Sequence, residues 1–383
     1  MRDADLDFLR RPYGQPVEGA GGPAFRAALG VEIPATLKLR DTIFNDPDEE
    51  AFGIRWWRPG PDDARRILIS DYLVGCAWAL ETNLIEARLH LLEALGFADQ
   101  HNRAMADSVA VEGNIMRLAA PEPTCAADEL PVNLMAMHIG GLFRAVGSVL
   151  DCLGGLVVGV LALPIRIYRA DLDSARRAIE KELSRGNDPG DLRRTFQTKL
   201  SESINSAGPA GWLEWANAYR NMLVHRGRRL NLHMLVPRPS LLRPDGTRIV
   251  RTEVVHLLTH DPERSDVETL IDSFGGTLSE PAELTLGELL KTVVWFTEAV
   301  TKELLLAWEK RSAEPALLAQ PREQWPEVPR PAGVFQGYEP GRVRVDPTAA
   351  MTGPASVRRL KAASMAGDSK ENWRRFIEAA QRS

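Results

Sequence analysis

The chain has 383 residues, enough for two or three domains or for one large helical domain with extensions. Its content of 44% hydrophobic and 26% charged residues is ordinary for a soluble globular protein. The net charge of -5 excludes a global basic field that would attract nucleic acid, so any RNA site has to be a local cluster of basic residues.

Cysteine usage and the apolar segments indicate the compartment. Cys76, Cys125 and Cys152 show neither metal-ligand spacing nor the even number of a disulfide set. The N-terminal sequence is acidic and lacks the apolar centre of a signal peptide. The apolar run 153–164 is too short to span a bilayer. We therefore expect a reduced, cytoplasmic protein without a membrane partner.

In the first third of the chain, a segment without regular apolar spacing is followed by one with helical apolar spacing. Residues 1–62 are rich in Gly, Pro and Asp, which predicts an irregular N-terminal arm with at most small strands. Residues 64–97 carry a stripe of apolar residues at helical spacing and predict a long helix that ends at Gly96. A shorter helix is expected around 102–119.

The middle of the chain predicts a central helix followed by charged ones. Residues 130–163 are apolar on nearly all sides from Leu142 onward, which is typical of a buried helix. Gly154 and Gly155 lie where another helix could approach closely. Charged helices are expected at about 169–186 and 189–206.

The next helix has a basic end. Pro209 provides a start, and Gly227 provides a stop. The apolar face between them consists of Trp212, Trp215, Ala216, Tyr219, Met222 and Leu223. Near its end the helix carries Arg220, Asn221 and His225. Arg226, Arg228 and Arg229 lie where cations suit the negative end of the helix dipole.

The spacing of an arginine and a histidine five positions later is not specific in this chain. It occurs as Arg220/His225, Arg228/His233 and Arg251/His256, and only the first pair lies on a helical pattern. On a regular helix Asn221 and His225 share a face, whereas Arg220 and His225 lie about 140° apart around the axis. Arg220 and His225 can converge on one ligand only if the last turn is distorted or a second copy of the helix contributes.

Two strands should follow the basic helix. The segments near 230–236 and 249–259 are short and rich in branched apolar residues, and Arg243-Pro244-Asp245-Gly246 is typical of a turn. A β-hairpin at about 230–259 is the simplest arrangement, with His233 and His256 opposite each other. Two histidines without a third ligand are weak grounds for a metal site, and we expect neither metal nor cofactor.

The last third predicts one more helix and an extension. Residues 285–311 have helical apolar spacing and should close the bundle. Residues 312–383 are Pro-rich, with a terminal amphipathic helix around 368–381 that could dock on the body, a second subunit or another protein. The domains expected are therefore an arm over 1–62, a helical domain over 63–311, and the extension.

The residues Arg220-Asn221-x3-His225, with the His-Arg-Gly ending, resemble the R-x4-6-H motif of the HEPN family of small α-helical domains. The resemblance covers about residues 64–230. It implies a mainly α fold, a HEPN-like bundle of long antiparallel helices. The small β-hairpin that the strand patterns predict would follow the motif helix. Many HEPN proteins are metal-independent ribonucleases that dimerise, so that two motifs form one composite site, and others are RNA-binding or interaction modules.

The residue types fit RNA cleavage by attack of the 2′-hydroxyl. Histidine can serve as acid or base near neutral pH, and the planar guanidinium of arginine binds two phosphate oxygens. Arg220 would bind the phosphate, His225 would transfer protons and Asn221 would support them. Arg226, Arg228 and Arg229 would bind the RNA strand, and Asp151 would orient the Arg-His site from behind.

Two interpretations of the motif stay open. The first is a toxin-like or defence-like endoribonuclease acting at a homodimer interface, with a 2′,3′-cyclic phosphate product implied by the resemblance. The second is a HEPN-like module without activity that binds RNA, or that binds a protein partner through the C-terminal tail. In the second case His225 would stabilise the helix end, Arg220 would pair with a carboxylate such as Glu214, and Asp151 would be a paired carboxylate at the edge of the core.

Overall fold

The structure is a computed structural model that describes residues 27–48, 53–54, 63–112, 115–118, 126–226, 232–237, 241–242, 248–249, 252–263, 276–314 and 338. Over these residues the protein is mainly α-helical. It forms two compact units. Unit 1 comprises Met1–Glu32, Glu81–Val149 and Ile204–Phe296, and unit 2 comprises Ile33–Leu80, Leu150–Ser203 and Thr297–Ser383.

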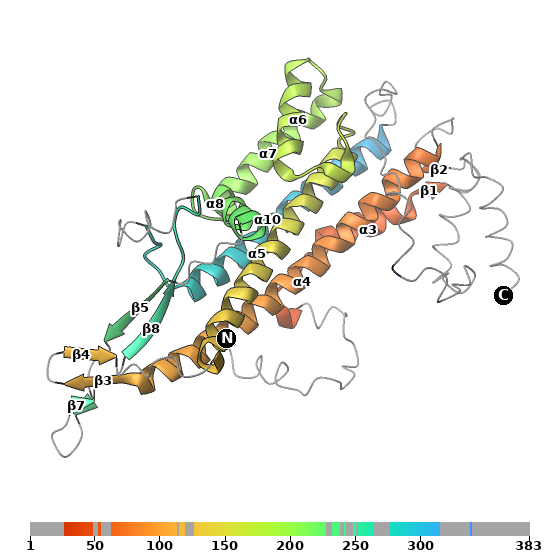
Figure 1. Cartoon of the computed structure of the whole chain (residues 1–383). Helices are drawn as coiled ribbons and strands as arrows, with labels where there is room; N and C mark the ends of the chain where they lie inside the picture. The colour runs from red at the N-terminus through yellow and green to blue at the C-terminus, as the bar shows by residue number, and fades with distance from the viewer. Residues whose placement is uncertain are drawn as a thin grey trace, which may run out of the picture. The chain divides into compact units, whose positions relative to one another are not determined.

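Three long helices contribute residues to both units. They are α4 (Asp63–Ser108), α5 (Ala126–Val160) and α10 (Ala282–Ala313), labelled in Figure 1. Unit 1 adds the helix α8 (Trp212–Asn221) and the π-helical turn η3 (Met222–Arg226). Its core is apolar and draws on each of these helices. Its buried apolar residues include Leu84, Leu91, Leu142, Phe143, Val146, Trp212, Leu213, Tyr219, Met222, Val293 and Phe296.

The strands that the structure describes in unit 1 are antiparallel pairs. β3 (Val109–Glu112) pairs with β4 (Ile115–Leu118) directly after α4. β5 (Leu232–Pro237) pairs with β8 (Thr252–Leu257), with Leu232 opposite Leu257 and Pro237 opposite Thr252. β6 (Leu241–Leu242) pairs with β7 (Arg248–Ile249). After β8, Thr259 bridges Thr277, which joins this segment to the chain just before α10.

Unit 2 begins with a helix where the sequence predicts an irregular arm. α3 (Pro34–Asn45) has Pro34 in its first turn and buries Thr36, Leu39 and Ile43, which recur at three- and four-residue steps. The expectation for residues 1–62 is therefore wrong over α3. The small strands β1 (Pro47–Asp48) and β2 (Gly53–Ile54) follow it.

Helix α10 anchors α3 through polar contacts. The amide of Ala35 donates to both carboxylate oxygens of Glu298, at 2.8 and 3.0 Å. A carboxylate at this position also satisfies the positive end of the α3 dipole. The hydroxyls of Thr36 and Thr301 are 2.9 Å apart. Burial raises the pKa of Glu298, against the two backbone hydrogen bonds that lower it.

The charged helices of unit 2 begin and end near the expected positions. A 3-10 turn, η1 (Ile167–Arg169), precedes α6 (Leu172–Ser184), and η2 (Pro189–Asp191) precedes α7 (Leu192–Ala207). Asp171 and Ser174 form a capping box at the start of α6. Gly154 on α5 allows the backbone of Asp171 to come close, because an added Cβ would lie 2.3 Å from the Asp171 carbonyl carbon.

Inside unit 2, two buried arginines donate hydrogen bonds to the backbone carbonyls at the C-terminal end of α5. Arg193 is fully buried, and its Nη2 donates to the carbonyls of Leu161 and Ala162, both at 3.2 Å. Arg311 donates through Nη1 to the carbonyls of Gly159 and Val160. Burial lowers the pKa of Arg311 to about 9, so its guanidinium stays charged at neutral pH. These cations satisfy carbonyls that no further helical turn can reach.

Helix α5 is the one described helix long and apolar enough over Leu130–Val160 to cross a membrane. Of the most apolar part of that segment, 78% is buried inside the protein. This burial is typical of a core helix, as expected for residues 130–163.

Helix α4 differs from its prediction at its C-terminal end. It runs twelve residues past Gly96, to Ser108, and the expected helix around 102–119 is replaced by the end of α4 and the strands β3 and β4. An added Cβ at Gly96 would meet nothing within 4 Å, and the glycine does not have the positive φ of a helix stop. Ala98 and His101 are buried beyond it, and this burial offsets the small helix cost of one glycine.

Candidate functional site

The candidate site lies at the end of α8, in unit 1. Gly211, with φ at 82°, precedes the first residue of the helix, and Glu214 in the first turn and Arg220 in the last suit the helix dipole. The indole of Trp212 donates to the carbonyl of Ile204 at 3.0 Å. The indole of Trp215 donates to the carbonyl of Thr259 at 3.1 Å, which ties α8 to the segment that follows β8.

An aromatic cluster fixes α8 against α5. The rings of Phe143 and Tyr219 stack with centroids 4.6 Å apart and an interplanar angle of 14°. Trp215 contacts both rings, 5.1 Å from Tyr219 and 5.6 Å from Phe143 between centroids. Because buried aromatic pairs contribute beyond their area alone, this cluster gives the last two turns of α8 a fixed position on α5.

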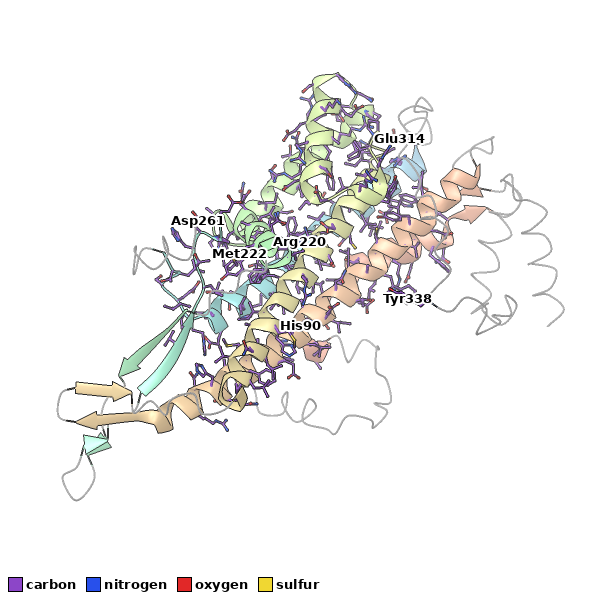
Figure 2. The ribbon with its side chains drawn as sticks, viewed as in Figure 1. His90, Arg220, Met222, Asp261, Glu314 and Tyr338 are labelled. Carbon is purple, nitrogen blue, oxygen red and sulfur yellow. The ribbon has the colours of Figure 1, made fainter. Side chains whose placement is uncertain are left out.

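Arg220 uses the space left by a glycine. A Cβ added at Gly147 of α5 would lie 2.3 Å from Nε and 2.4 Å from Cδ of Arg220. The arginine stem therefore crosses α5 at the one residue type that admits it, and Figure 2 labels Arg220 beside this helix. Sequence reasoning missed Gly147, because nothing in the sequence separates it from the other glycines of this apolar helix.

The turn that contains His225 is distorted. Met222–Arg226 form a π-helix, in which residue i bonds to residue i+5. A π turn is wider than an α turn, so each residue advances by fewer degrees. The angle between positions 220 and 225 around the axis therefore falls below the 140° or so of a regular α-helix. Such single π turns are frequent at functional sites.

The structure describes the side chains of some predicted site residues and not of others. Asn221 is exposed, Arg220 is half-buried, and the backbones of His225 and Arg226 lie in η3. The side chains of His225 and Arg226 lie outside the described residues, as do Arg228 and Arg229 entirely. The predicted turn 243–246 and the extension beyond Glu314, apart from Tyr338, lie outside them as well.

Asp151 falls in unit 2, whereas Arg220 falls in unit 1. In unit 2, burial of the phenol raises the pKa of Tyr72, and the neighbouring Cys76, Cys152 and lastly Asp151 raise it further. A hydrogen bond between the thiols of Cys76 and Cys152 raises the pKa of Cys76 and lowers that of Cys152. The orienting role of Asp151 stays a prediction.

A pair of half-buried histidines lies elsewhere in unit 1. Nδ1 of His90 on α4 and Nδ1 of His138 on α5 are 3.0 Å apart, and Phe97 stacks on His138. Burial, followed by the neighbouring His90, lowers the pKa of His138 against the opposing effect of Glu93. Gly141 gives His90 its room, since an added Cβ would lie 2.5 Å from the ring. This contact is a hydrogen bond between imidazoles that joins the two long helices.

Comparison with known proteins gives no identification. No family model, curated protein or solved structure matches the chain significantly.

Proposed function

We propose that the protein is a metal-independent endoribonuclease of the HEPN type that acts as a homodimer. The observation that carries this proposal is the π-helical turn Met222–Arg226, which begins two residues after Arg220 and contains His225. A regular helix would direct these two residues apart, and the wider turn reduces the angle between them.

Arg220 is suited to bind the scissile phosphate. Its stem is held over Gly147, so the side chain loses less freedom when a phosphate binds. The planar guanidinium binds two phosphate oxygens and stabilises the charge that develops on them during cleavage. Asn221 is exposed on the same helix end and supports the bound phosphate or the imidazole.

The reaction needs one base and one acid. The 2′-oxygen attacks phosphorus after a base removes its proton, and the bond from phosphorus to the 5′-oxygen breaks as an acid protonates that oxygen. The products are a 2′,3′-cyclic phosphate and a 5′-hydroxyl. Each chain supplies one His225, so two facing copies supply both proton-transfer groups without a metal.

The surroundings of the motif fit a second copy and an RNA strand. Val224, directly before His225, is an apolar side chain that is 44% exposed. Arg226, Arg228 and Arg229 give a local positive charge in a chain whose net charge is -5. We place the RNA strand along these arginines and the protein in the cytoplasm, without a membrane partner.

Substitution of His225 tests the proposal. Untagged, chelator-treated wild-type protein should cleave single-stranded RNA, and His225→Ala should lose about 10²–10⁴-fold in rate, the usual contribution of a positioned acid or base. His260→Ala removes an exposed histidine of the same unit and is the matched control, expected to cleave like the wild type.

Substitution of Arg220 tests its proposed role at the scissile phosphate. Arg220→Ala should lose cleavage while Arg103→Ala, which removes an exposed arginine of α4, should not. If His225→Ala and Arg220→Ala cleave as fast as their controls, the proposal is wrong. RNA binding without any cleavage by the wild type would favour the interaction module instead.

A further inference from the structure

Two reduced cysteines meet between α4 and α5 in unit 2. Cys76 of α4 is buried, with 6% of its surface exposed, and Cys152 of α5 is half-buried. A hydrogen bond joins the two thiols, although the residues are far apart in the chain. The phenol of Tyr72, one turn before Cys76 on α4, forms a hydrogen bond with the Cys76 thiol. The proposed cleavage chemistry uses neither thiol.

Two glycines of α5 bring the helix backbones close together beside this pair. An added Cβ at Gly155 would lie 3.2 Å from Sγ of Cys76, and one at Gly159 would lie 2.4 Å from Cδ2 of Leu73. Cys152, Gly155 and Gly159 recur at three- and four-residue steps, so they share the face of α5 that packs on α4. Figure 1 shows the two helices running side by side. Close backbone approach at glycines favours the Cα separation of about 4.4–6.8 Å that a disulfide needs.

The hydrogen bonds make Cys152 the more reactive thiol of the pair. The Cys76 thiol donates to the sulfur of Cys152, which lowers the pKa of Cys152 against burial and the charge of Asp151, both of which raise it. The same hydrogen bond, followed by burial, raises the pKa of Cys76. The thiolate, rather than the thiol, is the nucleophile that attacks an oxidant. Cys152 therefore supplies the nucleophile, and the Cys76 thiol is held next to it.

We propose that Cys76 and Cys152 are a reversible oxidation site, which hydrogen peroxide converts into a disulfide between α4 and α5. The Cys152 thiolate attacks one peroxide oxygen and the O–O bond breaks, which gives a sulfenic acid and hydroxide. The hydroxide takes up the proton that the Cys152 thiol released. The Cys76 sulfur then attacks the Cys152 sulfur, the S–O bond breaks, and the Cys76 proton leaves with that oxygen as water. Two thiols and one peroxide thus give one disulfide and two waters.

The oxidation site is independent of the proposed ribonuclease function. Both cysteines are reduced in the structure, and disulfides that form in the cytoplasm are usually transient and redox-sensing. The bond closes the chain between positions 76 and 152, which restricts the unfolded chain and thereby stabilises the folded one. Oxidation therefore ties α4 to α5 and makes unit 2 more resistant to unfolding.

Peroxide treatment of the untagged full-length chain tests the proposal without any RNA assay. Reduced protein is treated with hydrogen peroxide, blocked with iodoacetamide under denaturing conditions and digested without reductant, and mass spectrometry then locates any cross-linked peptide. The wild type should form a disulfide between Cys76 and Cys152 that dithiothreitol reverses, and oxidation should raise its midpoint of thermal unfolding. Cys125→Ser removes the third cysteine and is the matched control, expected to form the same disulfide at the same rate.

Variants of the pair separate the two roles. Cys76→Ser should stop at the sulfenic acid of Cys152, which dimedone labels, and should form no cross-link. Cys152→Ser leaves the buried Cys76, which should resist both peroxide and dimedone. Dimedone labelling of Cys76 in preference to Cys152, a cross-link to Cys125 in place of the expected one, or a treated wild type without a disulfide overturns the proposal. The peptide map of the wild type decides without any variant, so a serine variant that fails to fold leaves the test intact.

Discussion

The position of the Arg220 side chain depends on a glycine, Gly147. Gly147 leaves the gap that the stem of Arg220 fills, and Phe143, one turn earlier on α5, stacks on the neighbouring Tyr219. Position and orientation of a phosphate-binding group matter for rate, and a displacement of about 1 Å can cost about 100-fold. Under the proposed function, the packing of Arg220 on α5 therefore matters for cleavage as well as the motif residues themselves.

Gly147→Ala should lower RNA cleavage by about 10–100-fold, because the added methyl group displaces Arg220 without removing it. The fold should persist, since alanine favours a helix more than glycine does. Gly140→Ala on the same helix is the control, because an added Cβ there meets nothing within 4 Å. Equal cleavage rates in the two variants would show that the position of Arg220 is irrelevant.

His138 predicts a pH dependence of stability. Its pKa in the folded protein is lowered, chiefly by burial, so between that value and about 6.5 the unfolded chain binds more protons than the folded one. The contribution of His138 to the free energy of unfolding is therefore complete above about pH 6.5, and it is lost as the pH falls through the lowered pKa. The groups around the pair are His90 at 3.0 Å, Glu93, and Glu86, which lies 3.7 Å from Nε2 of His90.

Urea unfolding between about pH 5 and about pH 8 measures this effect. His138→Gln should flatten the fall in the free energy of unfolding on the acid side. His260→Gln removes an exposed histidine and should keep the wild-type profile. A His138→Gln profile with the same acid slope as the wild type would contradict the assignment.

At the level of elements, local sequence patterns were enough to predict most helices. Apolar spacing predicted 285–311, which corresponds to α10. The charged segments 169–186 and 189–206, separated by Gly186-Asn187-Asp188-Pro189, correspond to α6 and α7. Helix α4 beyond Gly96 could not be predicted, since its continuation depends on the burial of Ala98 and His101. Helix α3 was missed because the Gly and Pro around it dominate the composition of residues 1–62.

Substitution of Arg193 tests how much a buried cation at the C-terminal end of α5 stabilises the fold. Arg193 donates to Leu161, Ala162 and the Asn187 carbonyl, and its Nη1 lies 3.5 Å from Glu182. Arg193→Leu should lower the free energy of unfolding by about 3–5 kcal/mol, as removal of one partner of a buried ion pair does. Arg194→Leu, whose side chain is 69% exposed, should change it by less than about 0.5 kcal/mol. Chemical denaturation of the two variants makes the comparison, and equal stability would contradict the buried role.

For the whole molecule, the central expectation is that one chain alone is a poor enzyme. Cleavage per chain should fall as the protein is diluted below the dissociation constant of the dimer, because acid and base come from different copies. Light scattering at the same concentrations should show monomers appearing over the same range. A rate per chain that stays constant while the dimer dissociates would exclude the composite site.

The features of the site that the sequence could not predict are contacts between residues far apart in the chain. The sequence predicted Arg220, Asn221 and His225 at a helix end. It allowed Arg220 and His225 to converge only through a distorted turn or a second copy of the helix, and η3 is a distorted turn at that place. It did not predict the contact of Arg220 with Gly147, because the two residues are not related by a local period. Such contacts depend on how helices and strands pack, which no single segment encodes.

The most direct test of the cleavage proposal is the chemistry of the RNA ends. Single-stranded RNA incubated with untagged, chelator-treated protein is analysed by mass spectrometry for its terminal groups. The proposed mechanism predicts fragments with 2′,3′-cyclic phosphate and 5′-hydroxyl ends, formed by the wild type and not by His225→Ala. Fragments with 3′-hydroxyl and 5′-phosphate ends, cleavage that requires Mg²⁺, or equal cleavage by His225→Ala would contradict it.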